Sequence, residues 1–252
     1  PTRRSSDLPI FNEDRSIRIV FNGEIYNYPE LREDLQRKGH RFYTNSDTEV
    51  IVHAYEAYGE DFPNCLNGMF AFALHDEKKQ RIILARDHLG IKPLFYHLGE
   101  RHLIWGSEIK AILASGMVDR NLDIDALAQF LTWEYVPGAQ TLFKTIHKLK
   151  PGHVLTFDLA SGTADIRQFW DAPLADDTFP YSDEDWIDHI DQTIQSCVKR
   201  QLISDVPLGA FLSGGVDSSL VVAAMGNAKT FSIGFDDPSY NELTWARRVA
   251  EH

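Results

Sequence analysis

The sequence predicts two domains of different fold class, an α+β domain followed by an α/β domain. The first part of the 252-residue chain is rich in strands with helices between them, whereas the last part alternates helix and strand. Between them lies "DAPLADDTFPYSDED" (171–185), which is rich in Pro and Asp and poor in large apolar residues, as linkers are. We therefore place the first domain at 9–171, a linker at 172–185 and the second domain at 186–252.

The first domain opens with a strand. In "SIRIVFNGEIYN" the residues Ile17, Ile19 and Phe21 alternate with polar positions. The strand then meets Asn22-Gly23, a dipeptide that is a common signal for a hairpin or tight turn. On this local reading the strand ends at the dipeptide.

Two helices follow. The first is predicted over 28–39, with Pro29 in its first turn and Gly39 at its end. The second is predicted over 46–59, where Ser46 and Glu49 have the spacing of a capping box. Its apolar residues recur at helical spacing; they are Val50, Ile51, Ala54, Tyr55 and Tyr58.

The rest of the first domain reads mainly as strands, with two further helices. Strands are predicted at 68–76, 81–87, 92–98 and 153–159, and in the segment that ends at 171. The segment 102–116 reads as a strand that runs into a short helix, and 122–135 reads as a helix.

The second domain begins with a helix for which Ser182 is the predicted cap. A strand at 210–212, a helix at 217–226 and a strand at 229–235 follow. The first helix carries a predicted buried stripe; its members are Trp186, Ile187, Ile190, Ile194 and Val198.

Composition excludes several classes of protein. The net charge of −12 repels phosphate backbones, so nucleic acid is not expected as a partner. No apolar run approaches the roughly 20 residues that cross a membrane, and none has the character of a signal peptide. Cys65 and Cys197 form no paired motif, which fits a reducing cytoplasm and gives no zinc site. The ten histidines show no paired ligand spacing and are expected to be surface or core residues.

Both ends of the sequence are abrupt. Residues 1–8, "PTRRSSDL", resemble one reading frame of a sequencing-library adapter and are expected to be a non-native scar, with a natural basic tail as the alternative. The last residues, "ELTWARRVAEH", stop within a helical pattern. We therefore expect an internal piece of a longer protein.

The segment "FLSGGVDSS" (211–219) joins a short strand to a helix through glycines. Such a loop exposes free N–H groups at a helix N-terminus, where an anion is favoured, and serine hydroxyls add donors. A carboxylate such as Asp217 could hold Mg²⁺ against phosphates. A glycine pair alone would instead be a turn, with Asp217 or Ser218 capping the helix. No Walker A motif is present.

The whole string Ser-Gly-Gly-Val-Asp-Ser-Ser resembles the PP-loop of the ATP pyrophosphatases, which adenylate a carboxyl or similar oxygen. The resemblance implies an α/β adenine nucleotide alpha hydrolase-like domain, with ATP and Mg²⁺ as cofactors. It also implies that the strand from Phe231 to Phe235 lines the adenine pocket, and that Asp217 is the Mg²⁺ ligand. The ATP-binding residues it implies are Leu212, Ser213, Gly214, Gly215, Asp217, Ser218, Ser219 and Ile233.

The first domain carries a second set of motifs, "FNGEIYN", "TNSDTEVI", "LNGMFAFAL", "ARDHLGIKPLFY", "GSEIKAIL", "VPGAQTLFKTIHKLKPGHVLTF" and "FWD". With these motifs it resembles the class II, N-terminal-nucleophile (Ntn) glutamine amidotransferases, which implies an α+β Ntn hydrolase-type sandwich. The motifs "VPLGAFLSGGVDSS" and "FSIGFDDPSYNELTWARRVAEH" follow in the second domain. In this order, the two domains resemble the glutamine-dependent asparagine synthetases.

The resemblance assigns roles in the first domain. Amide hydrolysis through a thioester develops an oxyanion that needs fixed donors, and the Asn22 side chain and Gly23 N–H are expected to supply them. Glu24 and Asp47 are expected to hold the α-amino group of glutamine. For Asp47, a purely electrostatic role in the first helical turn is the alternative.

The sequence also departs from the family pattern. The family nucleophile is an N-terminal cysteine, whereas this sequence begins with Pro1. Cys65 is expected to be a buried core residue rather than a replacement. The arginine that would bind the glutamine carboxylate has no counterpart, and "YNEL" replaces a commoner Tyr-Asp-Glu. We therefore expect the chain as written to lack glutaminase activity.

The expected activity of the parent protein is glutamine-hydrolysing asparagine synthesis. Its substrates would be L-glutamine, L-aspartate and ATP. One alternative is a related amidotransferase that amidates another carboxylate, and a second is a non-catalytic nucleotide-binding protein. The sequence does not determine the oligomeric state, for which a homodimer is one option.

Overall fold

The computed structural model describes residues 8–173, 182–204 and 206–252. The chain divides into two compact units, Pro1–Pro173 and Leu174–His252, which we call unit 1 and unit 2. Residues 1–7 of the predicted scar and 174–181 of the predicted linker lie outside the described residues.

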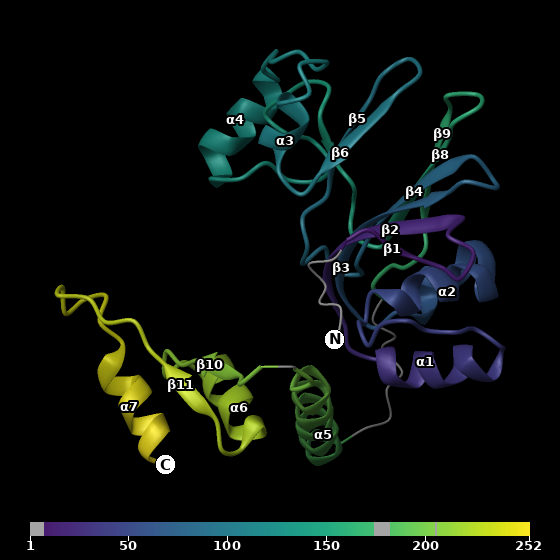
Figure 1. Ribbon diagram of the computed structural model, residues 1–252. Helices are drawn as coiled ribbons and strands as arrows, with labels where there is room; N and C mark the ends of the chain where they lie inside the picture. The colour runs from purple at the N-terminus through teal and green to yellow at the C-terminus, as the bar shows by residue number, and fades with distance from the viewer. Residues whose placement is uncertain (1–7, 174–181, 205) are drawn as a thin grey trace. The chain divides into compact units, whose positions relative to one another are not determined.

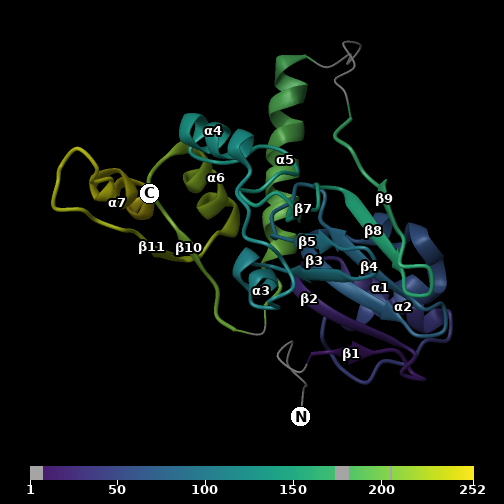
Figure 2. The ribbon, with the colours of Figure 1, turned by 90° about the horizontal axis from the view of Figure 1, so that it is seen from above.

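Unit 1 contains two antiparallel sheets (Figure 1). The larger has six strands in the order β1-β2-β3-β4-β8-β9, and Figure 2 shows β1 and β9 at its opposite edges. Its strands are β1 (Ile10–Phe11), β2 (Ile17–Ile25), β3 (Gly68–Asp76), β4 (Arg81–Arg86), β8 (His153–Asp158) and β9 (Ala164–Gln168). The smaller sheet consists of β6 (Leu103–Gly106), β5 (Phe95–Leu98) and β7 (His147–Lys148), in that order.

Helices cover the outer faces of both sheets (Figure 1). They are α1 (Tyr28–Arg37), α2 (Glu49–Tyr58), the 3-10 helix η1 (Gly59–Cys65) and α3 (Ile109–Leu113). Helix α4 (Ile124–Trp133) also belongs to unit 1. One apolar cluster joins α1 and α2 to one face of the larger sheet, and a second lies between the two sheets. A third packs α3 against the smaller sheet. The resulting helix–sheet–sheet–helix order confirms the sandwich predicted from the sequence.

The predicted turn at Asn22-Gly23 is wrong, because β2 runs through the dipeptide to Ile25. Gly23 lies opposite Phe70 in the β2–β3 ladder. A Cβ atom on Gly23 would lie 2.0 Å from the Met69 carbonyl oxygen. The glycine is therefore required by the close approach of a neighbouring strand, and the local turn signal does not apply.

The predicted capping box at Ser46 and Glu49 is also wrong. Helix α2 begins at Glu49 with Thr48 at the N-cap and no side-chain cap. The Glu49 carboxylate instead accepts hydrogen bonds from the backbone N–H groups of Tyr43 (2.8 Å) and Thr44 (2.7 Å). Glu49 thus fixes the chain that leads into α2.

The loop after β4 is organised by two side chains, Arg86 and Asp87. Buried Asp87 accepts hydrogen bonds from the backbone N–H groups of Phe70, Leu89, Ile91 and Lys92. The Arg86 guanidinium donates to three carbonyl oxygens, those of Gly90, Lys92 and Leu149. These bonds give the loop a defined shape although the side chains of Leu89 and Ile91 are exposed.

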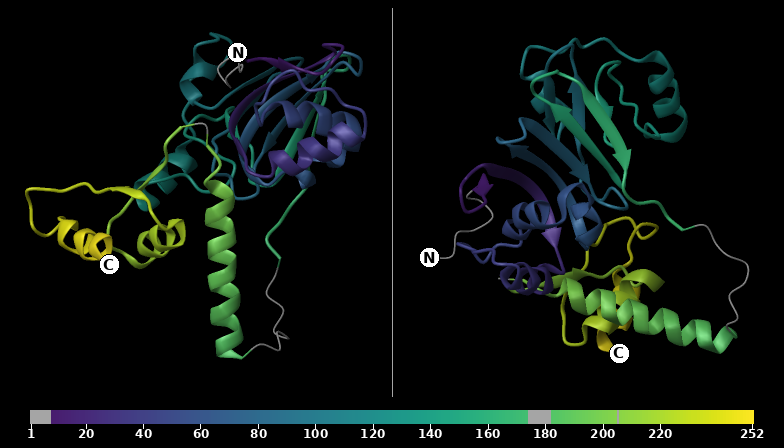
Figure 3. Two further views of the ribbon diagram at one scale, coloured as in Figure 1. Left: turned by 60° about the horizontal axis from the view of Figure 1, so that its bottom comes forward. Right: turned by 90° about the vertical axis from the view of Figure 1, so that its right-hand side faces the viewer.

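Unit 2 contains α5 (Asp183–Gln201), β10 (Gly209–Phe211), α6 (Val216–Met225), β11 (Lys229–Phe231) and α7 (Leu243–Glu251). Strands β10 and β11 are parallel and are connected through α6, which is the strand–helix–strand order of an α/β domain. Figure 3 shows α5 as one unbroken helix. The predicted cap is confirmed, since Ser182 and Asp185 form a reciprocal capping box.

Two predictions in unit 2 are wrong. The strand predicted over 229–235 ends at Phe231. The apolar residues of α5 were predicted to be buried, but Trp186 is only half-buried, and Ile187 and Ile190 are exposed. No residue of α5 in the described range is fully buried. None of the helices in the described ranges combines the length and the apolar character that a membrane crossing needs.

Candidate functional site

The predicted oxyanion donor Gly23 lies at an open part of a sheet edge. Residues along an antiparallel strand turn their N–H and C=O groups alternately to either side. Phe70, the partner of Gly23, exchanges both of its backbone groups with Asp87 on the β4 side. The Gly23 N–H therefore points away from β3. On that edge β1 pairs only as far as Ile19, so within the described residues no strand runs beside Gly23.

The Asn22 side chain projects from the sheet face that meets the smaller sheet. Asn22 is exposed, and its Nδ2 donates to Ser107 Oγ over 3.4 Å, a long hydrogen bond. Both residues line a cavity of about 180 Å³. Its wall also includes Val20, Ala71, Ala73, Leu94 and Trp105. Ser107, which is 85 residues away in the chain, was not among the site residues predicted from the sequence.

Asp47 lies beside the same edge of β2. Its Oδ2 accepts a hydrogen bond of 2.9 Å from the backbone N–H of Ile25. Ile25 and Gly23 are two residues apart and face the same edge, so their backbone N–H groups are about 7 Å apart along the strand. An extended amino-acid side chain can bridge such a spacing.

Burial raises the pKa of the Asp47 carboxyl, although hydrogen bonds from Ile25, Ser46 and Thr48 oppose the shift. The ionised carboxylate is therefore not fully compensated by its neighbours. A cation beside it would stabilise it, as expected for a residue that receives an amino group.

Glu24 is exposed on the same strand and lies opposite Met69. Burial, together with the charges of Glu24 and Asp87, raises the pKa of Tyr26. Glu24 therefore contributes negative charge to the end of β2 near Asp47, which is the surrounding an ammonium group requires.

Cys65 does not have the environment of an activated thiol. It was predicted to be buried, but it is only half-buried, at the end of η1 against the main core of unit 1. Burial, and then the charges of Asp34 and Asp61, raise the pKa of its thiol. A raised pKa disfavours the thiolate, which is the nucleophilic form, so we assign no catalytic role to Cys65.

The predicted phosphate loop of unit 2 lies between β10 and α6. Leu212 is buried, and its N–H donates to the Phe231 carbonyl, which extends the parallel pairing by one residue. Ser213 Oγ lies 3.0 Å from Ser218 Oγ and accepts from the Gly215 N–H. Helix α6 starts after Gly215 with no side-chain cap, so the N–H groups of its first turn are available to an anion.

The backbone conformation and close surroundings of Gly214 both favour glycine at this position. Its φ is +84°, and an added Cβ would lie 2.5 Å from the carbonyl carbon of Trp245 in α7. The loop therefore packs directly on the backbone of α7. This contact shapes the loop whether or not a phosphate is bound.

Asp217 is in the first turn of α6 and is exposed. Ser219 Oγ donates to the Gly215 carbonyl at 2.7 Å, which closes the start of the helix. Ile233 lies beyond the end of β11 and is 66% exposed. The structure therefore brings Leu212, Ser213 and the start of α6 together, whereas Ile233 stands on an irregular segment next to them.

One group of polar residues was missed by the sequence reading, namely Glu13, His40, His53 and Glu56, which converge beside α2. The only local signal was the His-x-x-Glu spacing of His53 and Glu56, which places both side chains on one helix face. The other two members come from distant segments.

Comparisons with known proteins agree with the order of the two units. Residues 2–170 match the glutamine amidotransferase domain family, and residues 189–252 match the asparagine synthase family. "Asparagine synthetase [glutamine-hydrolyzing] 3" of Bacillus subtilis (strain 168) is 41% identical over 207 residues, which are 81% of this chain and 33% of that protein. "Asparagine synthetase [glutamine-hydrolyzing] 1" of the same organism is 35% identical over 246 residues, 96% of this chain and 38% of that protein.

A solved structure, the glutamine phosphoribosylpyrophosphate amidotransferase from B. subtilis complexed with ADP and GMP, covers 90% of this chain and 48% of its own. It is 16% identical, with a TM-score of 0.46. The chain spans between a third and two fifths of the length of the two curated relatives above. Because the match at 2–170 covers more than half of the residues, the chain belongs to the family of glutamine amidotransferase domains.

Proposed function

We propose that the chain serves a glutamine-hydrolysing asparagine synthase of the cytoplasm. In the natural protein, the domain to which unit 1 belongs hydrolyses L-glutamine to L-glutamate and ammonia. Unit 2 binds ATP with Mg²⁺ and activates L-aspartate as β-aspartyl-AMP, with release of pyrophosphate. Ammonia then attacks the adenylate to give asparagine and AMP. The observation that carries the proposal is the order of the two family matches, a glutamine amidotransferase domain followed by asparagine synthase. The strand–loop–helix at the start of α6, which has no side-chain cap, lies within the second match.

In unit 1, the geometry supports a site along the edge of β2. Gly23 offers an N–H that points away from β3 at the open sheet edge, and Asn22 offers an amide in the wall of a cavity. Fixed donors of this kind stabilise an oxyanion without reorganisation. Asp47 and Glu24 lie farther along the strand, where they would receive the α-amino group of glutamine.

In unit 2, the start of α6 supports a phosphate site. The uncapped first turn and the Ser213 and Ser218 hydroxyls present donors on one loop. Asp217 carries a negative charge at the same place and would repel phosphate on its own. A Mg²⁺ ion between Asp217 and the phosphates removes this conflict, since Mg²⁺ is commonly held by one carboxylate and substrate oxygens.

Two other functions are compatible with the same units. A related amidotransferase would use the same ammonia and adenylation chemistry on another carboxylate. A non-catalytic protein would bind nucleotide without turnover. Product analysis with aspartate as the acceptor distinguishes the first, and any glutamine-dependent turnover excludes the second.

The test is Asp217→Ala in the natural protein that carries this chain. We expect ATP-dependent asparagine formation to be lost, while glutamate release from glutamine persists, because the metal site belongs to unit 2 alone. The matched control is Asp188→Ala, which removes an exposed carboxylate from α5 and should leave both activities unchanged. Equal loss of both activities in a folded Asp217→Ala protein would contradict the division of labour.

A further inference from the structure

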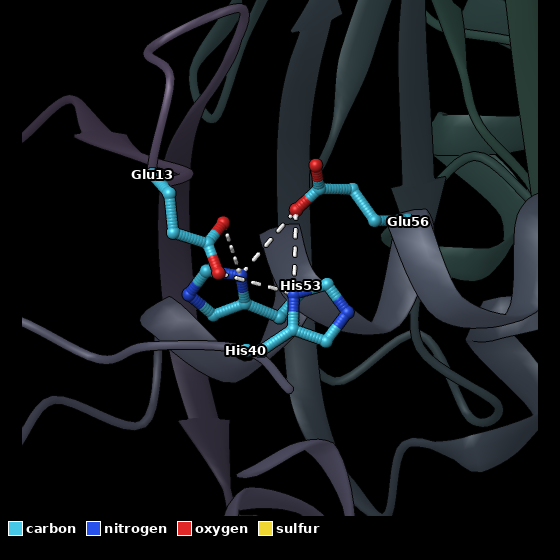
Figure 4. Close-up of side chains that lie close together, drawn as sticks. All are labelled: Glu13, His40, His53 and Glu56. Atoms are coloured by element: carbon cyan, nitrogen blue, oxygen red, sulfur yellow. Dashed lines mark hydrogen bonds and ion pairs between the residues drawn. The ribbon is translucent and has the colours of Figure 1, made fainter. Parts of the chain in front are cut away.

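Four side chains from three separate segments converge beside α2 (Figure 4). Glu13 comes from the turn between β1 and β2, and His40 comes from the connection between α1 and α2. His53 and Glu56 come from α2 itself. In Figure 4 the two imidazole rings and the two carboxylates face a common point, and one ligand atom of each residue lies within 4.8 Å of the others.

The spacing of these atoms suits a tetrahedral metal ion. Glu13 lies 3.2 Å from His40 Nδ1 through Oε1 and 3.3 Å from His53 Nδ1 through Oε2. Glu56 Oε2 lies 3.4 Å from His53 Nδ1 and 3.8 Å from His40 Nδ1. Metal–ligand bonds of about 2.0–2.2 Å in tetrahedral geometry place the ligand atoms about 3.3–3.6 Å apart.

His53 provides an observation independent of the cluster of carboxylates. Its side chain is fully buried, and its Nδ1 points into the cluster. Its Nε2 lies 3.5 Å from Glu49 Oε1, within ion-pair distance. Among the described residues, this nitrogen has no hydrogen-bond partner. Glu49 is itself fixed by the backbone N–H of Thr44. A carboxylate behind a histidine is the usual outer partner of an imidazole that binds a metal.

The two carboxylates are also held in place from outside. Glu56 Oε1 accepts a 2.8 Å hydrogen bond from Asn12 Nδ2, which leaves Oε2 directed at the histidines. Glu13 Oε1 accepts a 2.9 Å hydrogen bond from the backbone N–H of Arg41. The side chains of Glu13 and Glu56 are 36% and 26% exposed, so an ion can enter from solvent.

The simplest alternative is that a proton takes the place of the metal. Burial alone would lower the pKa of His53, but the neighbouring carboxylates of Glu49, Glu56 and Glu13 raise it to about 9. A proton on His53 would allow only that ring to pair with the carboxylates. A divalent ion would bind both imidazoles and both carboxylates at once.

We infer that Glu13, His40, His53 and Glu56 form a binding site for a zinc-type divalent transition-metal ion. Imidazole and carboxylate ligands suit such ions, and two carboxylates balance the charge of the ion. A bound ion would connect the β1–β2 turn and the α1–α2 connection to α2. It would stabilise this corner of unit 1 and take no part in glutamine chemistry.

The test uses the full chain after removal of metal with a chelator. Titration with ZnCl₂, followed by calorimetry and elemental analysis, should give one tightly bound ion per chain and a higher unfolding temperature. Glu13→Gln and His40→Gln should each weaken binding by more than about 10-fold. Co²⁺ in place of zinc should give the visible absorption of a tetrahedral complex.

Two controls keep the result specific to this site. His75→Gln changes a half-buried histidine on β3 outside the cluster and should bind zinc like the wild type. Alkylation of Cys65 and Cys197 should also leave binding unchanged. Zinc that is not retained, or that is retained equally by Glu13→Gln and His40→Gln, would overturn the inference. Circular dichroism confirms that each variant is folded, and Glu13→Gln is isosteric and partly exposed.

Discussion

Asn22→Ala separates a catalytic role from a structural one more sharply than any other substitution in unit 1. Asn22 is exposed on β2, and its only side-chain hydrogen bond in the described residues is the 3.4 Å contact with Ser107. A surface change of this kind alters the free energy of unfolding by at most about 0.5 kcal/mol. Loss of one oxyanion donor instead raises the barrier by about 2.7–4 kcal/mol. The kinetic effect should thus exceed the effect on stability several-fold.

The assay measures glutamate release from glutamine in the natural protein, together with thermal unfolding. We expect turnover to fall by about 10²–10³-fold. The Michaelis constant should change far less, because the donor acts mainly on charge that develops in the transition state. Asparagine formation from added ammonia should continue, because it bypasses unit 1.

Ser107→Ala is the matched control, since it removes the partner of Asn22 and keeps the donor. It should retain most of the turnover. A rate for Asn22→Ala within a few-fold of the wild type would refute the assignment. Asn22→Gly is a weaker probe, because position 22 lies inside a strand, where glycine costs about 0.5–1 kcal/mol of stability.

Three further substitutions test the backbone and the electrostatics. Gly23→Ala places a Cβ 2.0 Å from the Met69 carbonyl oxygen, so urea unfolding should show a loss of about 1–3 kcal/mol or more. Gly214→Ala should disturb the near-ultraviolet signal of the α7 tryptophan, whereas Gly215→Ala, with a φ of −73° and its nearest neighbour at 3.4 Å, should not. Asp47→Asn should raise stability near pH 7 while weakening glutamine binding. Because burial raises the folded-state pKa of Asp47, ionisation penalises the folded wild type above that pKa. The stability difference should shrink as the pH falls through the folded-state pKa, and a constant difference between about pH 7 and about pH 4 would contradict the assignment.

The sequence predicted elements well where local pattern and tertiary environment agree. Strand β3 has the predicted bounds Gly68–Asp76, since its apolar residues are buried on both faces. Helix α1 begins at Tyr28, with Pro29 in its first turn as predicted. In both elements, the residues that determine the local structure also contact the core.

The predictions from sequence are wrong where a residue with a local structural signal instead contacts another segment of the chain. Asn22-Gly23 has the sequence of a turn, but Gly23 is needed for the approach of Met69, which is 46 positions further along the chain. Glu49 has the spacing of a capping residue, but its carboxylate binds the chain before the helix. The cluster around His53 could not be predicted as a whole, since Glu13 is brought to it by the pairing of β1 with β2.

The loop shaped by Arg86 and Asp87 has a consequence for conformational entropy. Leu89 and Ile91 are 71% and 58% exposed, yet their backbone N–H groups are bonded to one buried carboxylate. Their amides should therefore exchange with solvent deuterium slowly, like those of a core strand and unlike those of an ordinary surface loop. Folding of unit 1 has already restricted this backbone. Any later contact with these two side chains would have only side-chain rotamers left to order, which makes association at this loop less costly than at a flexible one.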